Sequence, residues 1–275
     1  MSQNTVTRID AAHDGLGDAL VELARHRELM YFFVWRDVKV RYQQTLLGVA
    51  WAGLQPLGTM LIFTIVFGRL ANLPSDGVPY PVFVLAGLLP WQVFSMSLSG
   101  AANSLVGSAA LISKVYFPRL AVPVASALST LADFAVSLVL LLVLMAYYRI
   151  MPGPMVFLLP VFVLLALATA LAAGLWSSAL HVRYRDVKYI VPFVVQVWLF
   201  ASPVAYSMSI VKNPIARLAL ELNPMTAVIQ GFRWALIGSP APGGTVWVSI
   251  ALALTGLASG AAFFKRMETT FADVI

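Results

Sequence analysis

The sequence predicts an all-α integral membrane protein with six transmembrane helices. Of its 275 residues, 60% are hydrophobic and only 11% are charged, and the mean hydropathy is +0.85, whereas about a quarter of the residues of an ordinary soluble domain are charged. Long uncharged stretches alternate with short segments that carry Lys, Arg and Pro. A chain of this length holds about six spans of roughly 20 residues with short loops, so we expect one membrane-embedded bundle.

The segment 1–45 is expected to lie in the cytosol and to contain one amphipathic helix at the membrane surface. Its only early apolar run, 29–35, is followed by no small-residue cleavage site, which argues against a signal peptide. Apolar and aromatic residues then recur at helical spacing, with charged residues between them, as in a helix that lies in the headgroup plane. An ordinary juxtamembrane helix explains the pattern equally well. The apolar positions are Tyr31, Val34, Trp35, Val38 and Tyr42.

Six stretches are long and apolar enough to span a bilayer, because an α-helix rises 1.5 Å per residue and the hydrocarbon layer is about 30 Å thick. The first is the uncharged run 45–68. The others are 82–106, 120–148, 155–181, 190–211 and 246–264. The chain therefore divides into a cytoplasmic segment at 1–45, a transmembrane domain at 46–264 and a cytoplasmic tail at 265–275.

The distribution of basic residues predicts the orientation. Thirteen of the 18 Lys and Arg residues fall on the side of the two termini and five on the other side, so the positive-inside rule places both termini in the cytoplasm. The net charge of +6 is spread between apolar stretches rather than gathered in one patch, which argues against nucleic acid as a partner and favours lipid headgroups.

Residues that could carry catalysis are not found in the sequence. It contains no metal-ligand cluster, nucleophile elbow, phosphate-binding loop or paired-carboxylate site, and the lack of cysteines excludes disulfides and thiolate metal sites. We therefore expect a protein that is not an enzyme and that binds no metal or cofactor itself. If ATP is used, it must bind another polypeptide.

Asp133 is the one carboxylate placed well inside a predicted span. An ionised group there is costly and needs a buried partner. We interpret Asp133 as a structural polar residue that faces another helix, and a proton relay is the alternative. Carriers coupled to protons usually contain several such groups, and this chain has one.

Several short strings occur in an order that resembles one family, the polysaccharide and polyol phosphate export permeases of the type-2 ATP-binding cassette (ABC) exporters. The resemblance covers roughly residues 30–275, and its combination of strings is more specific than any one of them. The O-antigen branch fits best, and teichoic acid export permeases share much of the pattern. The strings are Trp-Arg-Asp-Val-Lys-Val-Arg-Tyr at 35–42, Thr-Leu-Leu-Gly at 45–48, Leu-Ile-Ser-Lys-Val-Tyr-Phe-Pro-Arg at 111–119, Arg-Tyr-Arg-Asp at 183–186, Ser-Pro-Val-Ala-Tyr at 202–206, Asn-Pro at 223–224 and Phe-Ala-Asp-Val-Ile at 271–275.

This resemblance implies a homodimer of permeases in the bacterial inner membrane with two nucleotide-binding ATPase subunits, which bind ATP and Mg, and a lipid-linked polysaccharide as substrate. It also implies short re-entrant periplasmic helices within 212–245. The N-terminal helix and the loop 114–119 would rest on the ATPases, with Phe117 as an anchor in a pocket of the partner. The expected ATPase-coupling residues are Lys114, Tyr116, Phe117, Arg119, Arg36 and Arg41.

Aromatic and neutral polar residues in or near the spans are candidates for lining a channel. Interfacial belts account for most aromatic residues of membrane proteins, but some can form flat surfaces along which sugar rings slide. The candidates are Tyr42, Trp51, Gln55, Phe63, Trp198 and Tyr206. The remaining alternatives are a capsule or teichoic acid exporter of the same family, a proton-coupled flippase for lipid-linked sugars, and a membrane-embedded glycosyltransferase.

Overall fold

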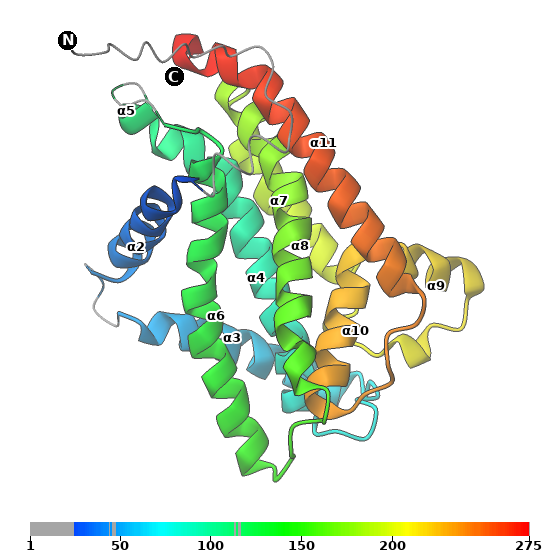
Figure 1. The fold of residues 1–275 in the computed structure, drawn as a ribbon. Coiled ribbons are helices and arrows are strands. Elements are labelled where there is room, and N and C mark those ends of the chain that lie inside the picture. The colour runs from blue at the N-terminus through cyan, green and yellow to red at the C-terminus, as the bar shows by residue number, and fades with distance from the viewer. Residues whose placement is uncertain (1–24, 44, 46–47, 113, 115–116, 275) are drawn as a thin grey trace, which may run out of the picture.

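The computed structural model describes residues 25–43, 45, 48–112, 114 and 117–274, and it contains no strand among them (Figure 1). Within the described residues, five helical segments are long and apolar enough to cross a membrane. They are Ala50–Leu70, Tyr80–Gly107, Ala121–Tyr147, Val156–Arg183 and Val246–Glu268. The predicted class, an all-α integral membrane protein, is confirmed.

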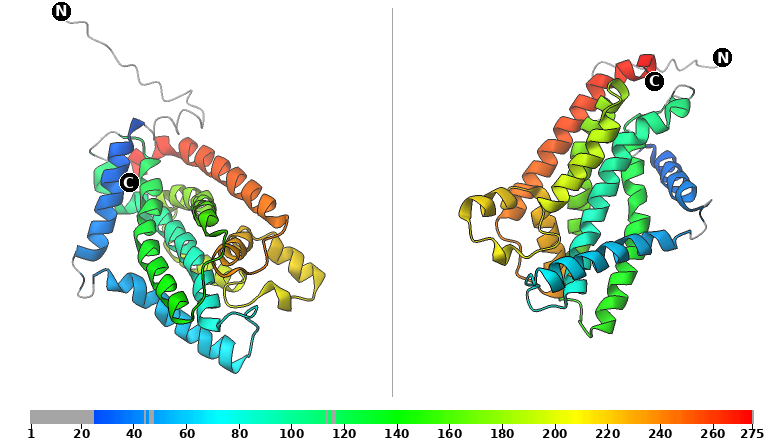
Figure 2. Two further views of the ribbon diagram at one scale, coloured as in Figure 1. Left: turned by 60° about the horizontal axis from the view of Figure 1, so that its bottom comes forward. Right: turned by 180° about the vertical axis from the view of Figure 1, so that it is seen from behind.

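Helix α4 (Tyr80–Gly107) forms the centre of the bundle. It packs against α6 (Ala121–Tyr147) and α7 (Leu159–Arg183), and the long C-terminal helix α11 (Thr245–Val274) packs along α7 (Figures 1 and 2). Small residues allow this close packing: a methyl group added at Gly174 of α7 would lie 2.8 Å from Cβ of Ala101 in α4. Without a hydrophobic driving force between helices in lipid, such close approach is what holds spans together.

Helix α2 (Arg27–Gln43) lies outside the spans and packs against α6 (Figure 2). The expected N-terminal helix is therefore present. Phe33 is the buried residue of α2, whereas Tyr31 and Trp35, two positions of the predicted apolar face, are 71% and 57% exposed. The contact of this face with the membrane surface stays a prediction.

The first span begins with α3 (Ala50–Phe63) and continues as the π-helical segment η1 (Thr64–Leu70). It crosses the lower part of the bundle beside α4 and α6 rather than running parallel to them (Figure 1). Only Pro56 and Met60 of α3 are buried. Most of this helix is thus available to lipid or to another protein. The short helix α5 (Ala109–Ile112) follows α4.

The region after α7 differs from the expected continuous fifth span. Helix α8 (Val187–Phe200) has 14 residues and rises about 21 Å, less than the hydrocarbon thickness of about 30 Å. The helix that was predicted at 190–211 ends at Phe200 instead. A turn and the 3-10 segment η3 (Met208–Ile210) follow it. A second 3-10 segment, η2 (Val156–Leu158), precedes α7.

Two short helices connect α8 to α11, in the segment where the family resemblance implied re-entrant periplasmic helices; their re-entrance and their side of the membrane stay predictions. They are α9 (Pro214–Glu221) and α10 (Pro224–Ile237). Each begins with an Asn-Pro pair in which the Asn side chain accepts hydrogen bonds from backbone N–H groups of the first turn, and this is a favourable helix start. α10 is largely buried and packs against α4, α7 and α11.

Candidate functional site

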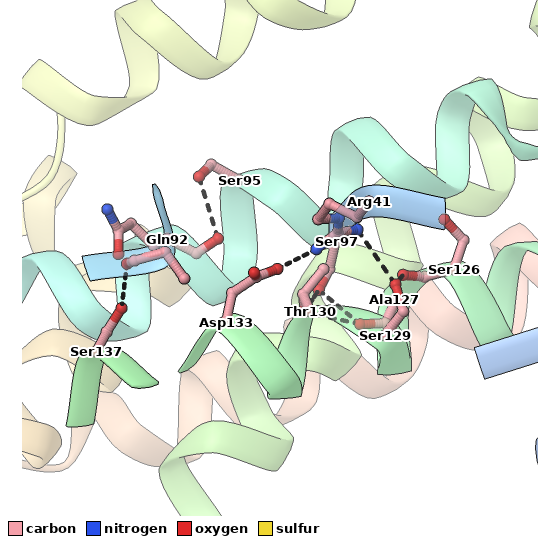
Figure 3. A network of polar contacts seen from close by, with 11 residues as sticks. Arg41, Gln92, Ser95, Ser97, Ser126, Ala127, Ser129, Thr130, Asp133 and Ser137 are labelled. Carbon is pink, nitrogen blue, oxygen red and sulfur yellow. Dashed lines mark hydrogen bonds and ion pairs between the residues drawn. The ribbon is translucent and has the colours of Figure 1, made fainter. Parts of the chain in front are cut away.

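A row of small polar side chains runs along one face of α6, which is otherwise apolar (Figure 3). The row connects α6 to two neighbours: Ser97 of α4 lies 2.8 Å from the Thr130 hydroxyl, and the Ser137 hydroxyl donates to the carbonyl of Ala52 in α3 at 3.0 Å. Such hydrogen bonds join helices inside a membrane. The members of the row are Ser126, Ser129, Thr130, Asp133 and Ser137.

Asp133 has its charge partner on α2. Arg41 donates from Nη1 to Oδ2 of Asp133, and from Nη2 to the Ser129 hydroxyl at 3.3 Å (Figure 3). The Asp133 side chain is 9% exposed and that of Arg41 is 34% exposed. A carboxylate within a span is expected to be paired in this way. The structure thus gives Asp133 a contact with another helix and places Arg41, which was predicted to contact the ATPase, against α6.

A cavity of about 260 Å³ adjoins this ion pair, between α2, α3, α4 and α6. Arg41, Asp133 and Gln92 contribute polar groups to its wall. The Tyr42 hydroxyl is buried there and has no hydrogen-bond partner among the described residues. Buried polar groups are rarely left unpaired, so the Tyr42 hydroxyl is an unusual feature of this cavity.

The structure brings together three of the six predicted channel-lining residues. Tyr42, Trp51 and Gln55 all line the cavity beside Arg41. Trp51 and Gln55 come from the exposed part of α3. The cavity thus joins the C-terminal end of α2 to the largely uncovered first span.

The other three predicted channel-lining residues lie elsewhere. Phe63 is half-buried and its ring contacts that of Phe67 at 5.3 Å. Trp198 donates from Nε1 to the side chain of Asn223 at 2.9 Å. Tyr206 follows α8, and its carbonyl accepts a hydrogen bond from Arg233 at 3.4 Å. Their contribution to a channel stays a prediction.

The residues of the predicted coupling loop have different environments. Lys114 is exposed, whereas Phe117 is only 8% exposed and packs edge-on against Phe33 of α2, with ring centroids 5.4 Å apart. Arg119 donates to the backbone carbonyl of Glu268 in α11. Tyr116 lies outside the described residues. In this chain Phe117 is therefore part of the contact with α2, and its role as an anchor in a pocket of an ATPase subunit stays a prediction.

Arg36, the remaining predicted coupling residue, makes its contacts within α2. It donates from Nε and Nη2 to the Asp37 carboxylate at 3.0 and 2.9 Å, and its guanidinium lies 5.1 Å from the centroid of the Phe33 ring. A role for Arg36 or Arg41 in contacting an ATPase stays a prediction.

The hydroxyl groups that accompany Asp133 were not predicted from the sequence. Ser129, Thr130 and Ser137 lie four, three and four residues from it, a spacing that puts all of them on one helical face with the carboxylate. This spacing of three and four residues could have identified the hydroxyl groups from the sequence. No group of three or more His, Asp or Glu residues that could hold a metal ion occurs in the described part of the chain.

Comparisons with known proteins match the chain over most of its length. The sequence model of the ABC-2 type transporter family matches residues 28–237. The O-antigen export system permease protein RfbA of Myxococcus xanthus is 33% identical over 258 residues, which cover 92% of this chain and 98% of that protein. A protein of the same name from Klebsiella pneumoniae is 23% identical over 90% of this chain and 95% of its own length. The polysialic acid transport protein KpsM of Escherichia coli is 35% identical over 60 residues, 22% of this chain and 23% of that protein.

Proposed function

Because the chain belongs to the ABC-2 type transporter family, we propose that it is the permease subunit of an exporter that moves a lipid-linked polysaccharide of the O-antigen kind across a bacterial inner membrane. The observation that carries this proposal is the match to an O-antigen export permease over nearly the full length of both chains. The shorter match to a polysialic acid transport protein favours the same class of substrate.

The cavity beside Arg41 supports a path for a hydrophilic molecule. It places an ion pair, two amides and an unpaired tyrosine hydroxyl next to an exposed span. Hydroxyl-rich sugars can exchange hydrogen bonds with all of these groups. Trp51, which is 54% exposed at the edge of the cavity, offers a flat ring to a sugar.

A second copy of the chain would complete this path. Helices α3 and α8 both pack against α4 and leave apolar faces uncovered. On α8, Phe193 and Phe200 are 67% and 61% exposed. In our proposal two permeases face each other across α3 and α8 and enclose a route lined partly by aromatic rings.

Energy would come from two separate ATPase subunits, which bind ATP and Mg. The exposed Lys114 and the neighbouring Arg119 lie on the side that the charge distribution makes cytoplasmic. Because Arg119 is hydrogen-bonded to α11, a displacement of this loop by an ATPase would act directly on the longest helix of the bundle.

Deletion of the gene, followed by complementation, tests the proposal. The deletion should remove the polysaccharide from the cell surface and cause its lipid-linked form to accumulate inside, and the wild-type chain should restore export only when the ATPase gene is intact. Unchanged surface polysaccharide in the deletion strain would contradict export. Restoration without the ATPase would indicate a proton-coupled flippase, and the sugar composition of the missing polymer would distinguish O-antigen from capsule or teichoic acid.

A further inference from the structure

A second polar pocket has a volume of about 340 Å³. Two of the helices that line it, α9 and α10, lie near the N-terminal end of α11 and far from its C-terminal end (Figure 1). Its walls come from the loop before α4, the turn around η3, helices α9 and α10, and the segment 239–243 after α10. It shares no lining residue with the cavity beside Arg41. The charge distribution places this end of the bundle on the periplasmic side.

One wall of the pocket presents a carboxylate. Asp76 has a left-handed backbone conformation with φ of 53°, which Asp adopts more readily than most residues. Its Oδ2 atom accepts a hydrogen bond from the hydroxyl of the buried Ser207 at 2.9 Å. The carboxylate is thereby fixed at the pocket and retains further lone pairs for a ligand.

The positive charges of the pocket are already engaged. Arg233 is 3% exposed, and four hydrogen bonds to backbone carbonyls use most of its five N–H donors. Arg217 donates from Nε to Glu221 at 2.9 Å. With Asp76, the pocket has two arginines and two carboxylates. An anionic ligand would therefore find no uncompensated positive charge, and no metal-binding cluster of His, Asp or Glu occurs within the described ranges.

Two neutral polar side chains of the pocket have no hydrogen-bond partner among the residues that the structure describes. The Ser239 hydroxyl is buried and makes no hydrogen bond with any described residue. The side-chain amide of Gln230 also lines the pocket and makes no hydrogen bond with any described residue. Unpaired buried hydroxyls are uncommon and call for a partner. Met208 and Pro240 add apolar surface against which C–H groups can pack.

A carboxylate, an amide and a hydroxyl around a charge-balanced hollow with one apolar side suit a neutral ligand that has hydroxyl groups on its edge and C–H groups on its face. We propose that this pocket binds one neutral sugar unit of the polysaccharide on the periplasmic side of the membrane. The source of the sugar rests on the proposed export function. The binding chemistry rests on the pocket alone.

Site-specific labelling tests the proposal in the full complex of permease and ATPase. The chain has no cysteine, so Ala241→Cys introduces a single thiol at an exposed position of the pocket wall, and a membrane-impermeant maleimide measures its accessibility. Among free D-glucose, D-galactose and D-mannose, at least one should slow labelling, about threefold at a concentration of twice Kd, because protection follows 1 + [L]/Kd. Labelling of Lys212→Cys, an exposed position outside the pocket, should not change.

Two further probes distinguish other ligands. Protection by glucose 1-phosphate or by Ca²⁺, but by none of the three hexoses, would overturn the proposal in favour of an anion or a cation. Saturation-transfer NMR with the same hexoses uses the wild-type complex and so remains decisive if Ala241→Cys does not fold. The signal should be present for wild type, lost in Gln230→Leu and retained in Gln196→Leu, a matched change on α8 outside the pocket.

Export measurements separate this inference from the proposed function. If the gene deletion leaves surface polysaccharide unchanged, the export function fails, but hexose protection at position 241 would still support the pocket. If wild-type export is confirmed while no hexose protects Ala241→Cys or gives an NMR signal, the sugar site is wrong and the exporter stands.

Discussion

The ion pair between Arg41 and Asp133 should respond unequally to removal of its two partners. Arg41→Met leaves a carboxylate that is 9% exposed without its counter-charge, whereas Asp133→Asn leaves a guanidinium that is 34% exposed. The arginine can still donate to Ser129 and to the new amide oxygen and can reach water. The buried carboxylate has less contact with water and can remove its charge only by taking up a proton, which itself costs free energy near neutral pH. We therefore expect Arg41→Met to be the more destabilising change.

Magnitudes follow from this difference in burial. Removing one partner of a buried pair typically costs about 3–5 kcal/mol, and the partial exposure of the pair puts Arg41→Met at the lower end, about 3 kcal/mol. Asp133→Asn replaces a charged hydrogen bond with a neutral one and should cost about 1 kcal/mol. The double variant leaves no unpaired charge and should cost about 2 kcal/mol, so the coupling between the two positions is about 2 kcal/mol.

Unfolding of the purified chain by SDS in mixed micelles, followed by tryptophan fluorescence, measures these free energies. Arg36→Met is the matched control, because its ion partner Asp37 is its neighbour in the same helix, and such a half-exposed pair contributes at most about 1 kcal/mol. The reasoning is refuted if Asp133→Asn is costlier than Arg41→Met, or if the two changes are additive within about 0.5 kcal/mol. Export by Asp133→Asn should stay near normal, and its complete loss at normal protein level would favour a proton relay.

Three further predictions concern packing, coupling and catalysis. Gly231→Ala should destabilise the chain by more than about 2 kcal/mol, because the added methyl group would lie 2.0 Å from the ring of Phe162. Gly58→Ala is the control, because its methyl group meets no atom within 4 Å and the change should be neutral. Thermal unfolding compares the two variants. Phe117→Ala should weaken co-purification with the ATPase or abolish export by loosening the contact with α2, while Lys114→Arg has little effect; normal export by Phe117→Ala would make the loop a plain connector. The purified chain should hydrolyse no ATP, and robust hydrolysis in a preparation shown to lack the partner would contradict this.

Much of the fold could be predicted from the sequence because charge and length decide where a chain can cross lipid. The predicted fifth span, 190–211, is longer than the observed helix for a physical reason. The uncharged stretch continues through Ser202 and Pro203, but the helix ends at Phe200. Arg233 donates hydrogen bonds to the backbone carbonyls of the turn that follows. That arginine lies about 30 positions later in the chain, so no local pattern could reveal its role.

The candidate site was predictable only in part. Asp133 was identified because one carboxylate in an apolar span is conspicuous, and Tyr42, Trp51 and Gln55 were among the expected lining residues. The partner Arg41 could not be assigned, because contacts between α2 and α6 depend on tertiary packing across 92 positions. For the same reason, the contact between Phe33 and Phe117 was not foreseen.

The pairing of α2 with α6 also constrains how the protein is made. Synthesis produces Arg41 before α3, α4 and α6, so the N-terminal helix emerges long before the carboxylate that it contacts. During insertion, Asp133 enters the membrane in a helix whose centre tolerates an acidic residue only at a cost of about 2.5–3.5 kcal/mol. Because α2 is synthesised first, the guanidinium of Arg41 can pair with Asp133 once α6 is inserted, and this pairing offsets the cost. Nascent chains that stop before residue 121 lack this contact, and α2 can take its final position only after the third span has been inserted.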